Sequence, residues 1–393
     1  MRDWHACYYL SLAEEGEVGL RGPQQLVWLG RLEQEADNFR AALEWALQRV
    51  RDTKYISVFP AFAQEMTQGK VVAGSKTLSL HGFPMTGVCS LELSLRLASA
   101  LRPYWEWQGY LSEARYWLSA ALSYTYQGTV VKTQKIARAK ALSEFARLTC
   151  LQNDQERALQ LANESVALWR QVDEPDGLIM ALLHCSWVGF AISDFAMIKV
   201  VLQEGIAIIS PANQWLHAQL LFYFASVEGF TNQFAHMHEC YAESKALFEQ
   251  VGDRCAIADL LKDKGGMLLL EGKFLESYDS LLQSLQLCYE LDHKQFITTG
   301  LGLLSFTAGV LAQPDPEQAS INSALFGGAA ESLMESSGFV PWTKTNDFIK
   351  SIRAYIRARI PEQRWQEAWA SGRAMTVEQA LELAQQIRTT FEE

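Results

Sequence analysis

Hydrophobic and polar positions repeat at intervals of about 40 residues between residues 134 and 294. Four equivalent stretches begin 40, 39 and 40 residues apart, at Ser165, Gly205, Ser244 and Ser284. A small residue recurs upstream of each stretch with the same step, at Ala146, Ser186, Ala225 and Gly265. Each small residue lies within an apolar segment, where two helices are expected to pass close together. The pattern therefore predicts units of two helices.

A short polar turn separates the two helices of each predicted unit. The turns begin at Asn153, Ser193, Asn232 and Gly272. An earlier, less regular unit has its turn at Gly109, and a later one ends in the segment at residues 325–335. Each unit is therefore expected to read helix, turn, helix, with roughly the ranges 134–172, 175–210, 213–251 and 253–291 for the four clearest.

This arrangement resembles the tetratricopeptide repeat, although the units are longer than that family's ~34 residues. The resemblance implies an all-α, right-handed solenoid of about six repeats of ~40 residues with helical caps at both ends. The expected organisation is an N-terminal helical segment at 1–50, an exposed loop insertion at 51–90, repeats at 91–338 and a C-terminal helical cap at 339–393.

The N-terminal segment is expected to hold a short helix over residues 4–13, a turn, and one long helix. The long helix carries an apolar stripe formed by Trp28, Leu32, Phe39, Leu43 and Leu47. Its sequence WLGRLEQEADNFRAALEWAL, at residues 28–47, resembles the segment that begins the helical arm of bacterial STAND regulators of the LuxR and NB-ARC types. Residues 325–338 and 365–384 resemble that arm's closing segments. The resemblance implies a MalT-like sensor arm whose ATPase or DNA-binding module lies elsewhere.

Composition and charge narrow the class of protein. The 393 residues carry a net charge of −11, which argues against general affinity for nucleic acid or anionic membranes. The seven cysteines stand singly and predict a reducing compartment. The N-terminus does not resemble a signal peptide, so a cytoplasmic location is expected. Two uncharged runs, at 177–193 and 295–313, fall where the repeat predicts buried helices rather than membrane spans.

Residues 51–90 depart from the family pattern and are expected to form an exposed loop containing a hairpin. The run GKVVAGSKT resembles a phosphate-binding loop, but Ser75 separates the second glycine from Lys76. A nucleotide-binding or hydrolytic enzyme that uses this loop is the alternative reading of the chain.

Other candidate chemistry is sparse. His236 and Cys240 share a helix face, but two ligands do not make a zinc site. His184 is expected to be a hydrogen-bonded core residue. The basic run at residues 350–359 is interpreted as a solvated face, or one that meets an acidic partner, rather than a nucleic-acid surface. The sequence therefore predicts no catalytic residues, no metal, no cofactor and no enzyme.

The resemblance also implies a binding surface. In the tetratricopeptide family, positions two, five and nine of the first helix line the concave groove when the turn residue is counted as fifteen. This rule selects Arg96, Lys140, Arg147, Trp187, Phe222 and Lys262. Four of these six are basic, which predicts a protein, peptide or anionic small-molecule effector. The expected function is thus a non-enzymatic scaffold, with a partner ATPase or DNA-binding module in cis or in trans and no direct contact with nucleic acid or membrane.

Overall fold

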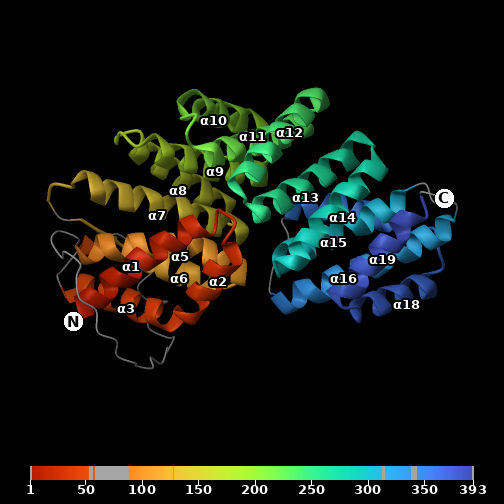
Figure 1. The fold of residues 1–393 in the computed structure, drawn as a ribbon, viewed down its shortest axis with the longest axis horizontal. Helices are drawn as coiled ribbons and strands as arrows, with labels where there is room; N and C mark the ends of the chain where they lie inside the picture. Colours follow the sequence, from red (N-terminus) through yellow and green to blue (C-terminus); the bar gives the residue numbers. More distant parts are fainter. Residues whose placement is uncertain are drawn as a thin grey trace. The chain divides into compact units, whose positions relative to one another are not determined.

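The computed structural model describes residues 2–52, 56–57, 89–126, 128–311, 315–337 and 343–391 (Figure 1). Within these ranges the chain is all-α apart from one pair of two-residue strands. It divides into two compact units, one formed by residues 1–192 with 207–209, the other by residues 193–206 with 210–393. Each unit is described by itself below.

The N-terminal unit contains helices paired along the chain. Its elements are α1 (Arg2–Gly19), α2 (Gln25–Gln34), α3 (Ala36–Asp52), α5 (Ser90–Gln108), α6 (Leu111–Leu122), α7 (Lys132–Leu151), α8 (Gln155–Trp169) and α9 (Pro175–Ile192). Strand β1 (Ile56–Ser57) pairs antiparallel with β2 (Tyr124–Thr125). The remainder of the predicted loop insertion, with its phosphate-loop-like run, lies outside the described residues.

The second unit continues the same pattern and ends in a cap. Its helices are α10 (Phe195–Ile208, except its last two residues), α11 (Gln214–Phe230), α12 (Phe234–Val251), α13 (Arg254–Glu271), α14 (Phe274–Glu290), α15 (Lys294–Val310), α16 (Pro316–Ser337), α17 (Thr343–Arg357), α18 (Glu362–Arg373) and α19 (Val377–Thr389). The pairs α11–α12, α13–α14 and α15–α16 pack together, and α11, α13 and α15 stack in succession. This packing is that of a helical repeat.

The predicted turns are confirmed. Gly109, Asn153, Ser193, Asn232 and Gly272 all have positive φ angles, between 58° and 84°. Helices α6, α8, α10, α12 and α14 begin two residues later in each case. The left-handed conformation is open to glycine and is tolerated by asparagine, so the residue type matches the backbone at four of these turns, while the fifth places Ser193 in this less common conformation.

A recurring hydrogen bond joins the two helices of a pair. The hydroxyl groups of Ser165, Ser244 and Ser284 each donate to the carbonyl oxygen 26 residues earlier, at 2.7 Å. The small residues predicted at the helix crossings are buried as well, and a Cβ atom at Gly265 would lie 2.6 Å from Leu281 Cγ. The two helices of a pair therefore approach closely where the sequence places its small residues.

The predicted N-terminal helices are wrong in their bounds. Helix α1 extends to Gly19 instead of ending at Ala13, because Gly16 packs against Leu32 rather than forming a turn. The single long helix is interrupted at Glu35, whose carboxylate accepts hydrogen bonds from Tyr9 Oη and Asn38 Nδ2 at 3.0 and 2.6 Å. The four stripe residues from Leu32 to Leu47 are nevertheless buried.

Polar residues of the 28–47 segment connect α2 and α3 to later helices. Glu33 accepts hydrogen bonds from the hydroxyl groups of Tyr104 and Tyr110, at 2.6 and 3.3 Å. Arg40 donates through two nitrogens to the carboxylate of Glu113, at 2.7 and 2.9 Å. These contacts hold the segment against α5 and α6, so these polar side chains stabilise the packing of the helices.

The two C-terminal segments that resemble the regulator arm pack on each other. Helices α16 and α18 cross where Gly328 faces Trp369 and Gly372 faces Leu325. A Cβ atom at Gly372 would lie 2.1 Å from the Leu325 carbonyl oxygen, and one at Gly328 would lie 2.2 Å from that of Trp369. At the start of α19, Thr376 and Gln379 exchange side-chain-to-backbone hydrogen bonds and form a capping box.

Helix α9 is long and apolar enough to cross a membrane by length and composition, and 56% of it is buried within the structure. It packs against α7 and α8 in its own unit. This packing accounts for its composition as that of a core helix of the repeat.

Enlarging a residue at a helix crossing is expected to destabilise the second unit. Ala225 in α11 is completely buried, so Ala225→Leu overpacks the interface and should lower the free energy of unfolding by about 1 to 3 kcal/mol. Thermal melting measures the effect. Ala242→Leu, on the exposed face of α12, is the matched control and should leave the melting temperature unchanged. Equal melting of the two variants would contradict the assigned register.

Two glycines allow a second comparison. Gly372→Ala should lower the free energy of unfolding by about 1 to 3 kcal/mol, because its new methyl group meets the backbone of α16. Gly30→Ala, in α2, meets nothing within 4 Å and should raise it by about 0.5 to 1 kcal/mol through reduced backbone freedom of the unfolded chain. Urea unfolding would show the opposite signs, and a neutral Gly372→Ala would contradict the α16–α18 crossing.

Candidate functional site

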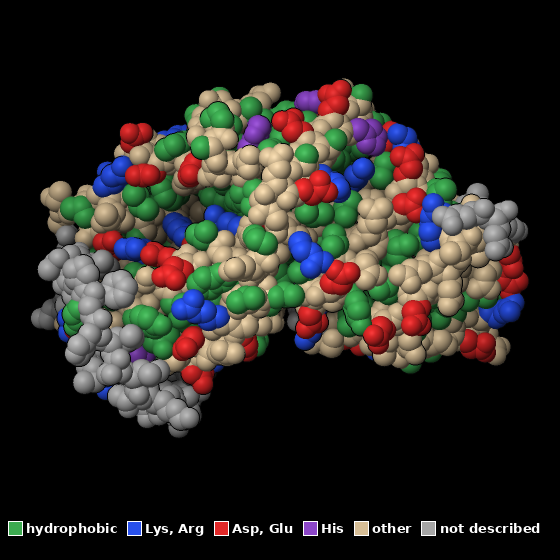
Figure 2. Space-filling view, in the orientation of Figure 1, with side chains coloured by type: hydrophobic (Ala, Val, Ile, Leu, Met, Phe, Trp, Pro, Cys, Tyr) green, Lys and Arg blue, Asp and Glu red, His purple; other side chains and the backbone are tan. Residues whose placement is uncertain are grey.

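The basic residues predicted for the groove of the N-terminal unit are all bonded to carboxylates. Arg96 in α5 donates to both oxygens of Glu14 in α1, at 2.8 and 2.9 Å. Lys140 in α7 forms an ion pair with Glu17 of α1. Figure 2 shows Lys and Arg side chains recessed among hydrophobic ones on this unit. Helix α1 therefore supplies negative charge to the predicted surface.

Arg147 contacts both a carboxylate and an aromatic ring. Its guanidinium donates to both oxygens of Glu106, at 3.0 and 2.7 Å, and its Cζ atom lies 4.0 Å from the ring centroid of Trp187. The guanidinium is thus fixed by a bidentate pair on one side and an aromatic ring on the other. The structure brings Arg147 and Trp187, two of the predicted site residues, into direct contact.

The Arg147 pair belongs to a buried chain of charges. Arg102 bonds to both Glu106 and Glu144. Burial by itself would raise the pKa of Glu106, but Arg147 and Arg102 hold that pKa well below its usual range. The pKa of Glu144 is also lowered, because the opposing effect of burial is outweighed by Arg102 and other nearby cations. Both carboxylates are therefore charged at neutral pH.

His184 lies near these charged groups as a buried neutral side chain. Its Nδ1 atom lies 2.6 Å from the hydroxyl oxygen of Ser143, and the side chain is almost completely enclosed. Burial lowers the pKa of His184 to about 4, despite the nearby carboxylate of Glu144. The prediction of a hydrogen-bonded core histidine is confirmed.

Phe222 and Lys262, the remaining predicted site residues, lie in the second unit. The Phe222 ring is 5% exposed and contacts the rings of Tyr223 and Tyr241, so it presents no open face. Lys262 bonds to Asp259 and lies 4.1 Å from the centroid of the Phe296 ring. The six predicted residues therefore form two sets, one in each unit.

The carboxylate partners were missed by the sequence analysis. Glu14 and Glu17 lie in the part of α1 that was expected to be a turn. Glu106 precedes Arg147 by 41 residues, and Ser143 precedes His184 by the same interval. This interval is close to the repeat length, so a search for complementary residues one repeat apart would have found both contacts.

The basic run near α17 is largely engaged within the chain. Arg353 lies over the rings of Trp369 and Phe306, with centroid distances of 4.9 and 5.8 Å. Arg357 pairs with Glu362, and Arg359 donates to the Gly309 carbonyl oxygen at 2.7 Å. These contacts reduce the charge that the run offers to phosphate.

No group of three His, Cys, Asp or Glu in the described part of the chain could hold a metal ion. His238 bonds to Glu271 at 2.8 Å, while Cys240 is buried. His236, 52% exposed, packs against the Phe224 ring. The histidine side chains of α12 therefore contact other residues of the fold, and its cysteine is part of the core.

Comparison of the chain with protein-family models gave no match, and comparison with curated proteins gave none either.

Titration of His184 is expected to reduce stability as the pH falls. The folded pKa is about 4 and the unfolded value about 6.5, so the unfolded chain takes up the proton first and the free energy of unfolding decreases between those values. The loss between pH 7 and pH 5 should be about 2 kcal/mol. Urea unfolding at the two pH values measures it.

His184→Gln keeps a hydrogen-bonding side chain opposite Ser143 but removes the titration, so its loss between the two pH values should be smaller. His236→Gln, at an exposed site, is the matched control and should behave as the unmodified chain does. The same pH dependence in all three proteins would show that His184 does not titrate in this way.

Proposed function

We propose that the chain is a non-enzymatic binding scaffold, a right-handed tetratricopeptide-like solenoid of about six helical pairs. It binds a protein or peptide segment along the faces of its first helices, in the groove that includes Arg96, Lys140, Arg147 and Trp187. The observation that carries the proposal is the regular step of helical pairs, which aligns side chains of successive helices on one surface.

The chemistry of this surface favours a protein or peptide over a simple anion. A small anionic effector would have to displace Glu14 from Arg96, Glu17 from Lys140 or Glu106 from Arg147. A peptide carries hydrogen-bonding groups of both kinds and an apolar surface. It can pair with the exposed edges of these ion pairs while it packs on Trp187, without leaving a buried carboxylate unpaired.

The resemblance of residues 28–47, 325–338 and 365–384 extends the proposal to a class of protein. In this view the scaffold is the sensor arm of a bacterial, cytoplasmic signalling or transcriptional regulator, and it acts on an ATPase or DNA-binding module in cis or in trans. Support comes from the role of these segments in the fold. Glu33 of α2 and Arg40 of α3 bond to side chains of later helices, and Gly372 lies at the close crossing of α16 and α18.

Selection of peptides from a displayed random library on the full chain tests the proposal. Selected peptides should bind saturably, and Trp187→Ala should weaken them by about tenfold or more because it removes the aromatic ring beside Arg147. Trp187→Phe, which retains a ring, should recover most of the affinity. Fluorescence anisotropy provides the measurement, and circular dichroism checks folding.

Trp187 is a cleaner probe than Arg147, because removing Arg147 would leave Glu106 buried without one of its cations. Val200→Arg, at an exposed position of α10 in the second unit, is the control and should not change the affinity. Peptides that bind all three variants equally, or a selection that yields no saturable binder, would contradict a binding site on the first-helix face.

A further inference from the structure

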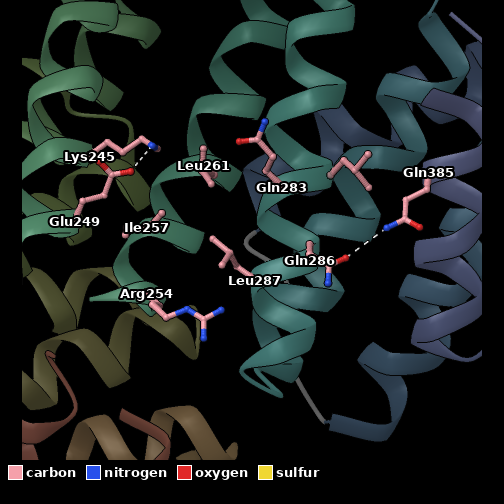
Figure 3. A pocket seen from close by; sticks show the side chains of 10 residues that line it. Lys245, Glu249, Arg254, Ile257, Leu261, Gln283, Gln286, Leu287 and Gln385 are labelled. Atoms are coloured by element: carbon pink, nitrogen blue, oxygen red, sulfur yellow. Dashed lines mark hydrogen bonds and ion pairs between the residues drawn. The ribbon is translucent and has the colours of Figure 1, made fainter. Parts of the chain in front are cut away.

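The second unit contains an open groove between α12 and α14, with α13 as its floor (Figure 3). Its volume is about 550 Å³. Apolar side chains line its base, while charged and carboxamide side chains form its edges. The lining residues of the base are Ile257 and Leu261 from α13 and Leu282 and Leu287 from α14.

The edges of the groove are polar but carry balanced charge. Lys245 pairs with Glu249 along α12, and Arg254 pairs with Glu290. On the opposite edge, Gln385 of α19 donates to Gln286 of α14 at 3.5 Å (Figure 3). With equal numbers of both charges at these edges, neither phosphate nor an anionic membrane is attracted by net charge.

The repeat itself shows what covers such a groove. Ser244 and Ser284 occupy equivalent positions of successive repeats and lie 40 residues apart. By the same step, the residues of α15 equivalent to the floor residues Ile257 and Leu261 are Ile297 and Leu301. Ile297 and Leu301 are 3% and 0% exposed. They belong to the buried cluster that includes the apolar stripe of α19, formed by Ala380, Leu381, Ala384 and Ile387.

Helix α19 is therefore docked against the second helices of two successive pairs. It packs on α14 and α16, and its position is fixed by polar contacts along α14. Tyr278 Oη donates to the Ala384 carbonyl oxygen at 3.0 Å, and Tyr289 Oη donates to Glu378 at 2.6 Å. Arg388 pairs with Asp279. An amphipathic helix thus lies over the surface one repeat after the open groove. Before it, no helix of the described residues fills the groove over α13, where Ile257 is partly buried and Leu261 is 6% exposed.

We propose that the groove over α13 binds one amphipathic helix of a partner protein, seated beside α19 in the same manner. The helix presents small and branched apolar residues, spaced as in α19, to Ile257, Leu261 and Leu287, and hydrogen-bonding side chains to Gln283 and Gln286. This site is formed by α12, α13, α14 and α19 of the second unit, and it does not depend on the proposed first-helix groove.

A peptide with the sequence of α19 provides the probe, because α19 already packs over the equivalent surface of the next repeat. Residues 376–390 would be labelled with fluorescein. A side-chain staple between positions 382 and 386, both exposed in α19, would hold the helix, since short helices are marginal in water. Anisotropy titration against the full chain should show saturable binding. Affinity should change less than about threefold between about 0.05 and 0.5 M salt, because apolar contacts dominate.

Ile257→Arg should weaken the probe by about tenfold or more, since a charged side chain would occupy the apolar floor. Gln283→Trp, at an exposed position of α14, should also weaken binding of the probe, because the larger side chain fills the groove. It provides the test if Ile257→Arg does not fold. Val200→Arg is the matched control, because Val200 is an exposed apolar residue of α10 outside the groove.

Three outcomes would overturn the proposal. The first is no saturable binding up to about 1 mM probe. The second is binding that neither groove variant weakens, which would mean that the probe displaces α19 or attaches elsewhere. The third is co-sedimentation with phosphatidylserine-containing vesicles that Gln283→Trp abolishes, which would assign the face to a membrane.

Discussion

The structure depends on a close approach between the two helices of each pair. A buried small residue marks each predicted crossing, and in three pairs a serine hydroxyl of the second helix reaches a carbonyl oxygen of the first at 2.7 Å. A hydroxyl can reach a main-chain oxygen on a neighbouring helix only when the backbones are close. The contact therefore sets the register of each pair, and the left-handed turn residue between the helices follows from the short distance that the chain must span.

The regular register of the helices brings polar and charged side chains of successive repeats together. Side chains one repeat apart in the sequence become neighbours on stacked helices, so Glu106 meets Arg147 and Ser143 meets His184. Removing these charged groups from water costs free energy, which the bidentate geometry and the second cation offset. Such a network contributes little net stability, but it penalises any alternative register, because a shift of one helix would leave a buried charge unpaired. The same pairing engages Arg96, Lys140 and Arg147 with carboxylates of the chain itself.

Both ends of the chain use the same physical means as the repeats. In the N-terminal unit, Gly16 allows α1 to approach Leu32, while Glu33 and Arg40 bond to later helices. At the other end, Gly328 and Gly372 allow backbone contact between α16 and α18, and α19 covers the apolar bed of α15. Among the described residues, no helix fills the groove over α13, which is the surface proposed for a partner.

The sequence alone determined the all-α class, the positions of the turns, the small residues at the crossings and the burial of His184, because these depend on local backbone preference and on a period that can be read along the chain. It misjudged α1 and the break at Glu35, since Gly16 is a packing residue and Glu35 bonds to Tyr9, which lies 26 residues earlier. It also selected Arg96, Lys140 and Arg147 as basic groove residues without their partners. Only the tertiary structure decided the charge of that surface, because Glu14, Glu17 and Glu106 reach these cations through helix stacking, and the pairing of side chains between helices has no signature within any one helix.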